Sequence, residues 1–174
     1  KKLTDYPTYD VLIIDDGSTD GSLDQVQEKD HLKIIRNPQK SGAGYDIRKI
    51  LDYAKEKGYE AVFFFSGNDK DDPLDIEKLK QAMEEGFDFV QGSRYLPGGH
   101  YGGMPLYRRI TTQFIHPFLF SLITGRRITD STNGFRAIRL SMLVHSRIDI
   151  YQDWLNEYEL EPYLLYRAIK LDYK

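Results

Sequence analysis

The chain contains no cysteine among its 174 residues, which excludes disulfides, thiolate nucleophiles and zinc sites built on cysteine. It also lacks a marked excess of charge: 24 Lys and Arg stand against 27 Asp and Glu, a net charge of −3, so binding to nucleic acid is not expected. No apolar run approaches the ~20 residues that cross a bilayer, because the longest, residues 114–124, contains His116 and Pro117. Residues 1–10 do not have the pattern of a signal peptide. The chain is therefore expected to be soluble or peripheral, and its length suits a single domain.

What the chain does contain is a distinctive stretch at residues 11–22, VLIIDDGSTDGS. Four consecutive apolar residues predict a strand buried on both faces, and the polar residues after it predict a turn and helix caps. Asp15 and Asp16 end this strand, and the ligands of open parallel sheets bind beyond the carboxyl ends of strands. The two carboxylates are therefore candidates for binding a ribose, a base or a metal. The alternative is that they only cap the turn and the next helix.

Further apolar runs alternate with helical patterns. Strand–helix–strand order with short links predicts an α/β fold with a mostly parallel central sheet and flanking helices. A glycine-rich segment, residues 97–103, is expected to form a mobile loop, and residues 129–137 a polar link. The predicted strands are 32–35, 61–65 and 87–91, and the predicted helices are 42–58, 72–86, 104–123 and a C-terminal helix around Leu160, Leu164 and Ala168.

A second polar segment, residues 66–73 (SGNDKDDP), directly follows the predicted strand 61–65. Several oxygen ligands that leave one strand end together suit Mg²⁺ or Mn²⁺ bound to a diphosphate, and Lys70 could neutralise a phosphate directly. The alternative is a polar loop that caps the next helix, a role that suits Asp72.

Three later segments add candidate phosphate ligands. Arg94 follows the predicted strand 87–91 and has the forked donor geometry that suits phosphate, with a surface salt bridge as the alternative. Arg108 and Thr112 lie four residues apart and so share one face of a predicted helix, next to an apolar, aromatic stretch. A phosphate anchor beside an apolar helix suits a lipid phosphate; the alternative is a core-facing helix with solvated arginines. Residues 130–136 (DSTNGFR) add a carboxylate, an amide and a guanidinium around a tight turn.

Six segments in this order make the sequence similar to a known family: IIDDGSTDGS, NPQKSGAGYDIRKIL, FFFSGNDKDDP, GSRYLPGG, ITDSTNGFRAI and WLNEYELEPYLLYRAIKLDYK. The chain resembles the family 2 glycosyltransferases with the A-type nucleotide-sugar fold, and within them the dolichyl- and polyprenyl-phosphate sugar transferases. The resemblance implies an inverting hexosyltransferase that moves a hexose from a nucleoside diphosphate sugar to an acceptor, expected to be a polyprenyl phosphate. It also implies one domain, 1–174, in which residues 1–95 bind the nucleotide sugar and residues 96–174 form the acceptor side.

The resemblance implies roles for individual residues as well. The nucleotide sugar is expected to contact Asp15, Asp16, Gly42, Gly44, Asn68 and Lys70. The candidate metal ligands are Asn68 and Asp69, and the acceptor residues are Arg108, Thr112 and Arg136. The candidate catalytic residues are Arg94, Asp130 and Glu159, with Asp153 and Glu157 as further acids if the acceptor is a sugar hydroxyl that must lose a proton.

Three departures from the family pattern bear on function. The family's Asp-X-Asp metal signature is replaced by Ser66-Gly67-Asn68, whose neutral oxygens bind cations more weakly than carboxylates do. This weighs against a requirement for Mg²⁺ or Mn²⁺ and leaves Asp69 or Lys70 to compensate. The usual first strand is absent, and the sequence stops at Tyr173-Lys174, where relatives continue.

These departures leave two other classes open. One is a catalytically silent or truncated nucleotide-sugar-binding domain. The other is a receiver-like signalling domain, which also begins with a strand ending in two aspartates but needs a phospho-accepting Asp where Ser66 stands. The expected partners are a nucleotide sugar, a lipid-phosphate or glycan acceptor and a membrane surface, without nucleic acid. The expected location is the cytoplasm, peripheral to the cytoplasmic face of the membrane.

Overall fold

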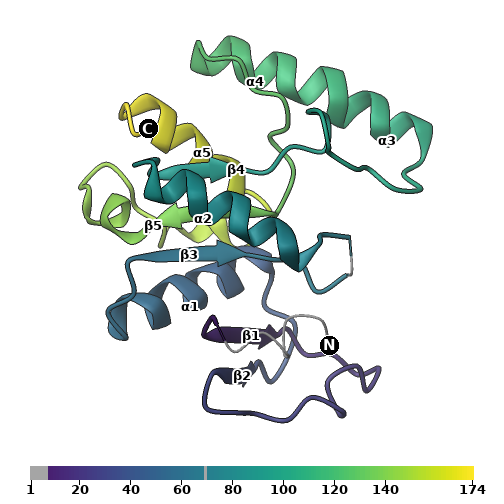
Figure 1. Ribbon diagram of the computed structural model, residues 1–174, viewed down its shortest axis with the longest axis vertical. Helices are drawn as coiled ribbons and strands as arrows, with labels where there is room; N and C mark the ends of the chain where they lie inside the picture. The colour runs from purple at the N-terminus through teal and green to yellow at the C-terminus, as the bar shows by residue number, and fades with distance from the viewer. Residues whose placement is uncertain (1–7, 69) are drawn as a thin grey trace.

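The strands form two separate small sheets in the computed structural model, which describes residues 8–68 and 70–174 (Figure 1). In the first sheet, β1 (Val11–Asp15) pairs in parallel with β2 (Leu32–Arg36). In the second, β5 (Arg136–Arg139) lies between β3 (Ala61–Phe64) and β4 (Phe89–Gln91) and runs antiparallel to both. Strands β3 and β4 are therefore parallel to each other.

Helices join these strands and cover the second sheet. Helix α1 (Ala43–Glu56) joins β2 to β3 and contacts both β1 and β3. Helix α2 (Ile76–Glu84) joins β3 to β4 and packs on β4 and β5. The remaining helical elements are η2 (Pro73–Asp75), α3 (Leu106–Ile110), η3 (Thr111–Ile115), α4 (His116–Thr124), η4 (Leu140–Val144), η5 (Asp153–Leu155) and α5 (Leu160–Lys170).

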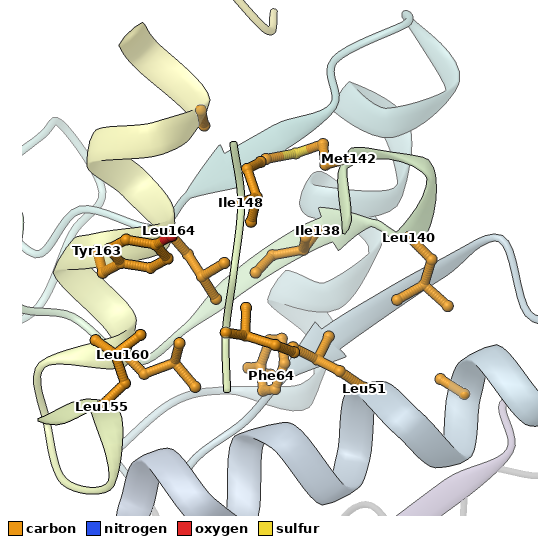
Figure 2. Packing of buried hydrophobic residues seen from close by; sticks show 13 residues of the cluster. Leu51, Phe64, Ile138, Leu140, Met142, Ile148, Leu155, Leu160, Tyr163 and Leu164 are labelled. Atoms are coloured by element: carbon orange, nitrogen blue, oxygen red, sulfur yellow. The ribbon is translucent and has the colours of Figure 1, made fainter. Parts of the chain in front are cut away.

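The main hydrophobic core lies between α1, α5 and one face of the second sheet (Figure 2). Leu51 of α1, Phe64 of β3, Ile138 of β5 and Leu164 of α5 are all buried there. Successive side chains of a strand point to opposite faces, so Ala137 lies on the other face, where it packs against the buried side of α2. Strand β5 is thus covered on both faces and paired on both edges.

The α/β fold class predicted from the sequence is confirmed, but two local predictions are wrong. Residues 11–14 are half-buried instead of buried on both faces, because β1 pairs only with β2. Among the described residues, no strand pairs with the other edge of β1 or with the outer edge of β3. The predicted polar link also ends in the central strand β5, which the arginines at both ends of the strand concealed.

Residues 106–124 form one continuous helical segment, close to the predicted helix 104–123. Its middle turn, η3, is a π-helix flanked by the α-helices α3 and α4. Figure 1 shows this segment at the margin of the molecule, away from the two sheets. None of the helices within residues 8–68 and 70–174 combines the length and apolar character that crossing a membrane requires.

Candidate functional site

The carboxyl ends of β1, β3 and β4 lie on the same side of the molecule, on the right in Figure 1. Most of the residues that the sequence singles out follow these strand ends. They gather in two groups: an acidic cluster (Asp15, Asp16, Asn37 and Asp46) after β1 and β2, and an arginine cluster (Asp71, Arg94, Asp130 and Thr132) after β3 and β4. This is the edge at which open α/β sheets bind their ligands.

Asp15 closes the turn after β1. Its buried carboxylate accepts the backbone N–H of Ser18 at 2.9 Å and lies 3.6 Å from the guanidinium of Arg36. The hydrogen bonds with Ser18 hold the pKa of Asp15 below its ordinary value. This carboxylate therefore stabilises the turn after β1. The sequence left this role open as the alternative to ligand binding.

Asp16 holds the loop that leads into α1. Its carboxylate accepts the backbone N–H groups of Ser41 at 2.6 Å and Gly42 at 3.1 Å, and the side-chain amide of Asn37 at 2.9 Å. Burial on its own would raise the pKa of Asp16, but these three hydrogen bonds outweigh it and lower the pKa. Asp16 is therefore a fixed anion at the sheet edge, with a structural role whether or not it also contacts a nucleotide.

Asn37, which sequence reasoning missed, organises the acidic cluster. Its buried amide donates to Asp16 and, at 2.7 Å, to Asp46, and its oxygen accepts from the ammonium of Lys49 at 2.7 Å. Burial raises the pKa of Asp46, and the nearby charge of Asp16 acts in the same direction. The available signal was the position of Asn37 directly after β2, at the carboxyl end of the strand.

Gly42 and Gly44 are required by packing within the chain. A Cβ on Gly44 would lie 2.1 Å from the carbonyl oxygen of Leu155, and one on Gly42 would lie 2.8 Å from Oε1 of Glu157. Arg48 of α1 donates to the carbonyl oxygen of Leu155 at 2.9 Å and fixes the same contact. Packing alone therefore explains why both positions are glycine, without the predicted contact with a nucleotide. The close packing also brings Glu157 beside the loop that Asp16 binds.

Arg94 and Asp130, predicted separately as catalytic residues, are partners. The guanidinium binds the carboxylate in a bidentate pair, with Nε–Oδ2 at 2.7 Å and Nη2–Oδ1 at 2.9 Å, and Nη2 also reaches Oγ1 of Thr132 at 2.6 Å. Such paired bonds are strong and fix the plane of the arginine. The Asp130 side chain is fully buried, and its hydrogen bond raises the pKa of Arg94. Asp130 therefore orients Arg94 and is not placed to act as a base.

Asp71 is a further carboxyl group near Arg94, within the segment 66–73 that the sequence offers as a source of oxygen ligands. It is half-buried, and burial raises its pKa although a backbone hydrogen bond from Ser66 and the charges of Arg94 and Lys70 oppose the shift. Perturbed carboxyl groups at a ligand-binding edge are candidates for acid–base chemistry.

The described residues do not fit a divalent cation at the end of β3. Asn68 is exposed, and its amide oxygen accepts the backbone N–H of Lys70 at 3.3 Å. Within residues 8–68 and 70–174, no three His, Asp or Glu side chains lie close enough to hold a metal ion. Asp69, the other predicted ligand, lies outside the described residues. The ends of β3 and β4 do carry two cationic groups, those of Arg94 and the exposed Lys70.

Thr112 is buried and ties the long helix to the end of β4. Its hydroxyl donates to the carbonyl oxygen of Arg108 at 2.8 Å and shares a 2.5 Å hydrogen bond with the hydroxyl of Tyr95. The ring of Tyr95 stacks on Tyr101 of the glycine-rich loop. The guanidinium of Arg109 lies 4.1 Å from the centroid of the Tyr101 ring. Arg108 is exposed and remains available for an acceptor, whereas Thr112 is engaged by the fold.

Arg136 and Glu159, the remaining predicted site residues, lie near the start of α5. The side chain of Arg136 is 2% exposed and pairs with Glu161 at 3.0 Å, while also donating to the Glu161 carbonyl oxygen at 3.1 Å. Burial lowers its pKa. Because it is enclosed, Arg136 is not placed to meet an acceptor, which corrects the expectation from the sequence. Glu159 is exposed at the first turn of α5.

Comparison with known proteins points to one family. A model of the family described as glycosyl transferase family 2 matches residues 1–146. Polyprenol monophosphomannose synthase of Mycolicibacterium smegmatis is 28% identical over 168 residues, which cover 94% of this chain. Undecaprenyl-phosphate mannosyltransferase of Micrococcus luteus is 28% identical over 79% of the chain, and dolichol-phosphate mannosyltransferase of Pyrococcus furiosus is 29% identical over 75%.

The alignments cover only part of these relatives. They include 62% of the M. smegmatis protein, 57% of the M. luteus protein and 38% of the P. furiosus protein. The similarity therefore concerns a segment of each relative and not its whole length.

Proposed function

Because the chain belongs to glycosyl transferase family 2, we propose that it transfers a hexose from a nucleoside diphosphate sugar to a polyprenyl phosphate, with inversion at the anomeric carbon. The names of the three relatives support a lipid phosphate as the acceptor and mannose as the sugar. The observation that carries the proposal is the arginine cluster. It holds a permanently charged, rigidly oriented guanidinium at the sheet edge where a donor diphosphate would bind.

In the proposed reaction, an oxygen of the lipid phosphate attacks the anomeric carbon from the face opposite the nucleotide. The new bond joins that oxygen to the anomeric carbon, and the bond between this carbon and the diphosphate breaks. The electron pair leaves with the nucleoside diphosphate. Arg94 stabilises the negative charge that grows on this leaving group, and Asp130 holds the guanidinium of Arg94 in place. A lipid phosphate is already anionic, so it needs no strong general base.

Two other basic residues near this edge of the sheet are proposed to bind the phosphates of the donor and the acceptor. Lys70 offers a second positive charge to the donor phosphates after β3. The exposed Arg108 stands next to the Thr112–Tyr95 contact and thus close to the arginine cluster, where it would hold the acceptor phosphate. If the acceptor were instead a sugar hydroxyl, Asp71, Glu157 or Glu159 would have to remove its proton.

A catalytically silent nucleotide-sugar-binding domain is the second candidate. It is favoured by the segment after β3, where Ser66-Gly67-Asn68 stands in place of Asp-X-Asp and the described residues do not fit a divalent cation. The receiver-like alternative is set aside, since the family match covers residues 1–146.

A transfer assay with UDP-, GDP-, CDP- and dTDP-mannose and a short-chain polyprenyl phosphate tests the proposal. We expect turnover, and we expect Arg94→Lys to lower kcat by about 100-fold, because lysine keeps the charge but cannot form the bidentate pair. Arg147→Lys, at an exposed position outside the arginine cluster, is the matched control and should leave kcat unchanged. Thermal stabilisation by one of these nucleotide sugars without turnover would support the silent domain. No stabilisation by any nucleotide sugar would overturn both candidates.

A further inference from the structure

The residues that follow β3 offer few ligands for a divalent cation. Mg²⁺ bound at a phosphate is usually held by one or two carboxylates, together with phosphate oxygens and waters. Positions 66–68 are Ser66, Gly67 and Asn68, which supply only neutral oxygens. The amide oxygen of Asn68 also accepts the backbone N–H of Lys70 at 3.3 Å. A cation there would therefore depend on the carboxylates further along the loop.

The carboxylates of this loop that the structure describes, those of Asp71 and Asp72, are both engaged by the backbone. Asp72 caps η2 by accepting a backbone N–H at 3.0 Å. Asp71 is half-buried and accepts a backbone hydrogen bond from Ser66. Asp71 also lies near Arg94 and Lys70, whose positive charges would repel a dication bound to it. The described part of the loop is therefore a poor site for Mg²⁺ or Mn²⁺.

Arg94 does not supply the missing positive charge by itself. A donor diphosphate is a multiply charged anion, and its charge must be balanced where it binds. The guanidinium of Arg94 can donate hydrogen bonds to phosphate oxygens, but its charge is already balanced by the buried carboxylate of Asp130 at 2.7 Å. The site therefore needs a second cation whose charge is not offset within the protein.

Lys70 has the properties of this second cation. Its side chain is exposed, and none of the carboxylates in the described part of the chain forms an ion pair with it. In the following helix, by contrast, Lys78 pairs with Asp75 at 2.5 Å and Lys80 with Glu84 at 3.8 Å. A lysine ammonium is a compact point charge that binds phosphate well. The ammonium of Lys70 is thus available at the carboxyl end of β3.

We propose that the ammonium group of Lys70 takes the place of a divalent cation, so that this chain binds its donor diphosphate without Mg²⁺ or Mn²⁺. The inference rests on the proposed function, because it requires a nucleotide sugar that lies across the ends of β3 and β4. Lys70 then contacts the diphosphate from the side of β3, and Arg94 contacts it from the side of β4.

A cation that belongs to the chain has a measurable consequence. It needs no binding equilibrium of its own, so the affinity for the donor should not depend on the concentration of free metal ion. The alternative is that Lys70 is only a solvated surface residue, in which case its removal should not affect binding. Donor binding can be measured without an acceptor and without turnover, so it reports on the site separately from transferase activity.

Isothermal titration calorimetry with the four nucleotide sugars of the transfer assay tests the inference. One of them should bind in EDTA, and Mg²⁺ or Mn²⁺ should change its Kd by less than about threefold. Lys70→Gln should raise this Kd by at least about tenfold, because a hydrogen bond between charged groups is lost. Lys70→Arg keeps the charge and should keep most of the affinity. Lys55→Gln, at an exposed position in the last turn of α1, is the matched control and should have no effect.

A triple variant tests whether Lys70 stands where a cation would bind. Ser66→Asp and Asn68→Asp introduce two carboxylates after β3, and Lys70→Gln removes the ammonium group. This variant should bind the nucleotide sugar weakly in EDTA, and Mn²⁺ should strengthen its binding by at least about tenfold. No response of the folded triple variant to Mn²⁺ or Mg²⁺ would mean that Lys70 does not stand in the place of a cation.

Two further results would overturn the inference and leave the proposed function standing. One is binding of a nucleotide sugar by the wild-type chain only when Mg²⁺ or Mn²⁺ is present. The other is an equal Kd for Lys70→Gln and Lys55→Gln. Failure of every nucleotide sugar to bind, with or without metal, would overturn the inference and the proposed function together. Circular dichroism and the thermal midpoint of each variant establish that the fold is intact.

Discussion

Asp16 and Asp46 accept hydrogen bonds from the same amide, that of Asn37, yet their pKa values shift in opposite directions. The pKa of Asp46 is raised in the folded state, so the fold is favoured while this carboxyl is protonated. That contribution is lost as the pH rises through the folded pKa. Asp46→Asn should therefore stabilise the protein at neutral pH, by less than about 1 kcal/mol.

The sign of this effect can be checked by urea unfolding across the acid range. The stability gain of Asp46→Asn should vanish below about pH 3.9, the ordinary pKa of an aspartate, where the wild-type carboxyl is protonated in both states. Asp24→Asn, at an exposed position, is the control variant. A gain for Asp46→Asn that persists at low pH would mean that burial is not its cause.

Gly44 supports a second residue-level prediction. Because a Cβ there would lie 2.1 Å from a backbone oxygen of Leu155, Gly44→Ala must push the segment before α5 away from α1. We expect a loss of about 2 kcal/mol or more in the free energy of unfolding. Gly103→Ala has no atom within 4 Å of the added Cβ and should change stability by less than about 0.5 kcal/mol. Equal midpoints for the two variants in urea would show that the contact is loose.

Local sequence patterns predicted where the candidate site residues lie in the fold better than they predicted what those residues contact. The apolar run before Asp15 and Asp16 correctly placed both carboxylates at a strand end, since strand patterns depend on neighbours along the chain. The roles depend on distant partners. Arg136 is of a residue type that often binds phosphate, but it is enclosed by its ion pair with Glu161 of α5. The neighbouring residues in the sequence do not indicate this pairing. Asn37 was missed for the same reason, and Asp71 was predicted only as part of the segment 66–73, without its place beside Arg94.

At the scale of elements, β5 shows that a polar local sequence can hide a central strand. Residues 129–137 were predicted to form a polar link because they are polar and rich in turn residues, but β5 begins within them at Arg136, which is buried by its ion pair. At the other end of the strand, Arg139 binds Asp88 at 3.4 Å and the carbonyl oxygen of Met83 at 2.8 Å. The long helix was predictable, because its apolar spacing is strong and local. Its π-turn was not, because no residue type specifies one.

The contact between Tyr95 and Thr112 joins β4, the glycine-rich loop and the long helix, so it can be tested as a link between elements. Since Thr112 already donates to Arg108, Tyr95 supplies the proton of the 2.5 Å hydrogen bond. Tyr95→Phe should lower stability by about 1 kcal/mol and should speed proteolysis within residues 96–103. Tyr107→Phe, on the exposed face of the same helix, is the control. Unchanged cleavage in Tyr95→Phe would show that stacking on Tyr101 alone holds the loop.

At the scale of the whole molecule, stability should be uneven because the two sheets have different support. Strand β5 has a partner on each edge, and its Ala137 and Ile138 have no exposed surface. Strand β1 has one partner among the described strands. Apart from α1, this region reaches the second sheet through contacts such as Tyr9, whose ring lies edge-on to Phe63 at 6.2 Å. A unit with few buried apolar contacts opens at a lower free energy than the rest of the fold.

Hydrogen exchange can measure this difference directly. The amides of Val11 and Asn37 bond to His31 and Asp15 at the ends of the first sheet, and those of Gly92 and Arg139 bond to Phe135 and Asp88 at the second. The first pair should exchange through local opening, well before the second pair, whose protection should approach the global free energy of unfolding. Equal protection would mean that the two sheets unfold as one unit. A ligand bound across the acidic and arginine clusters should reduce the difference in protection between the two sheets, because it binds only when both sheets are folded.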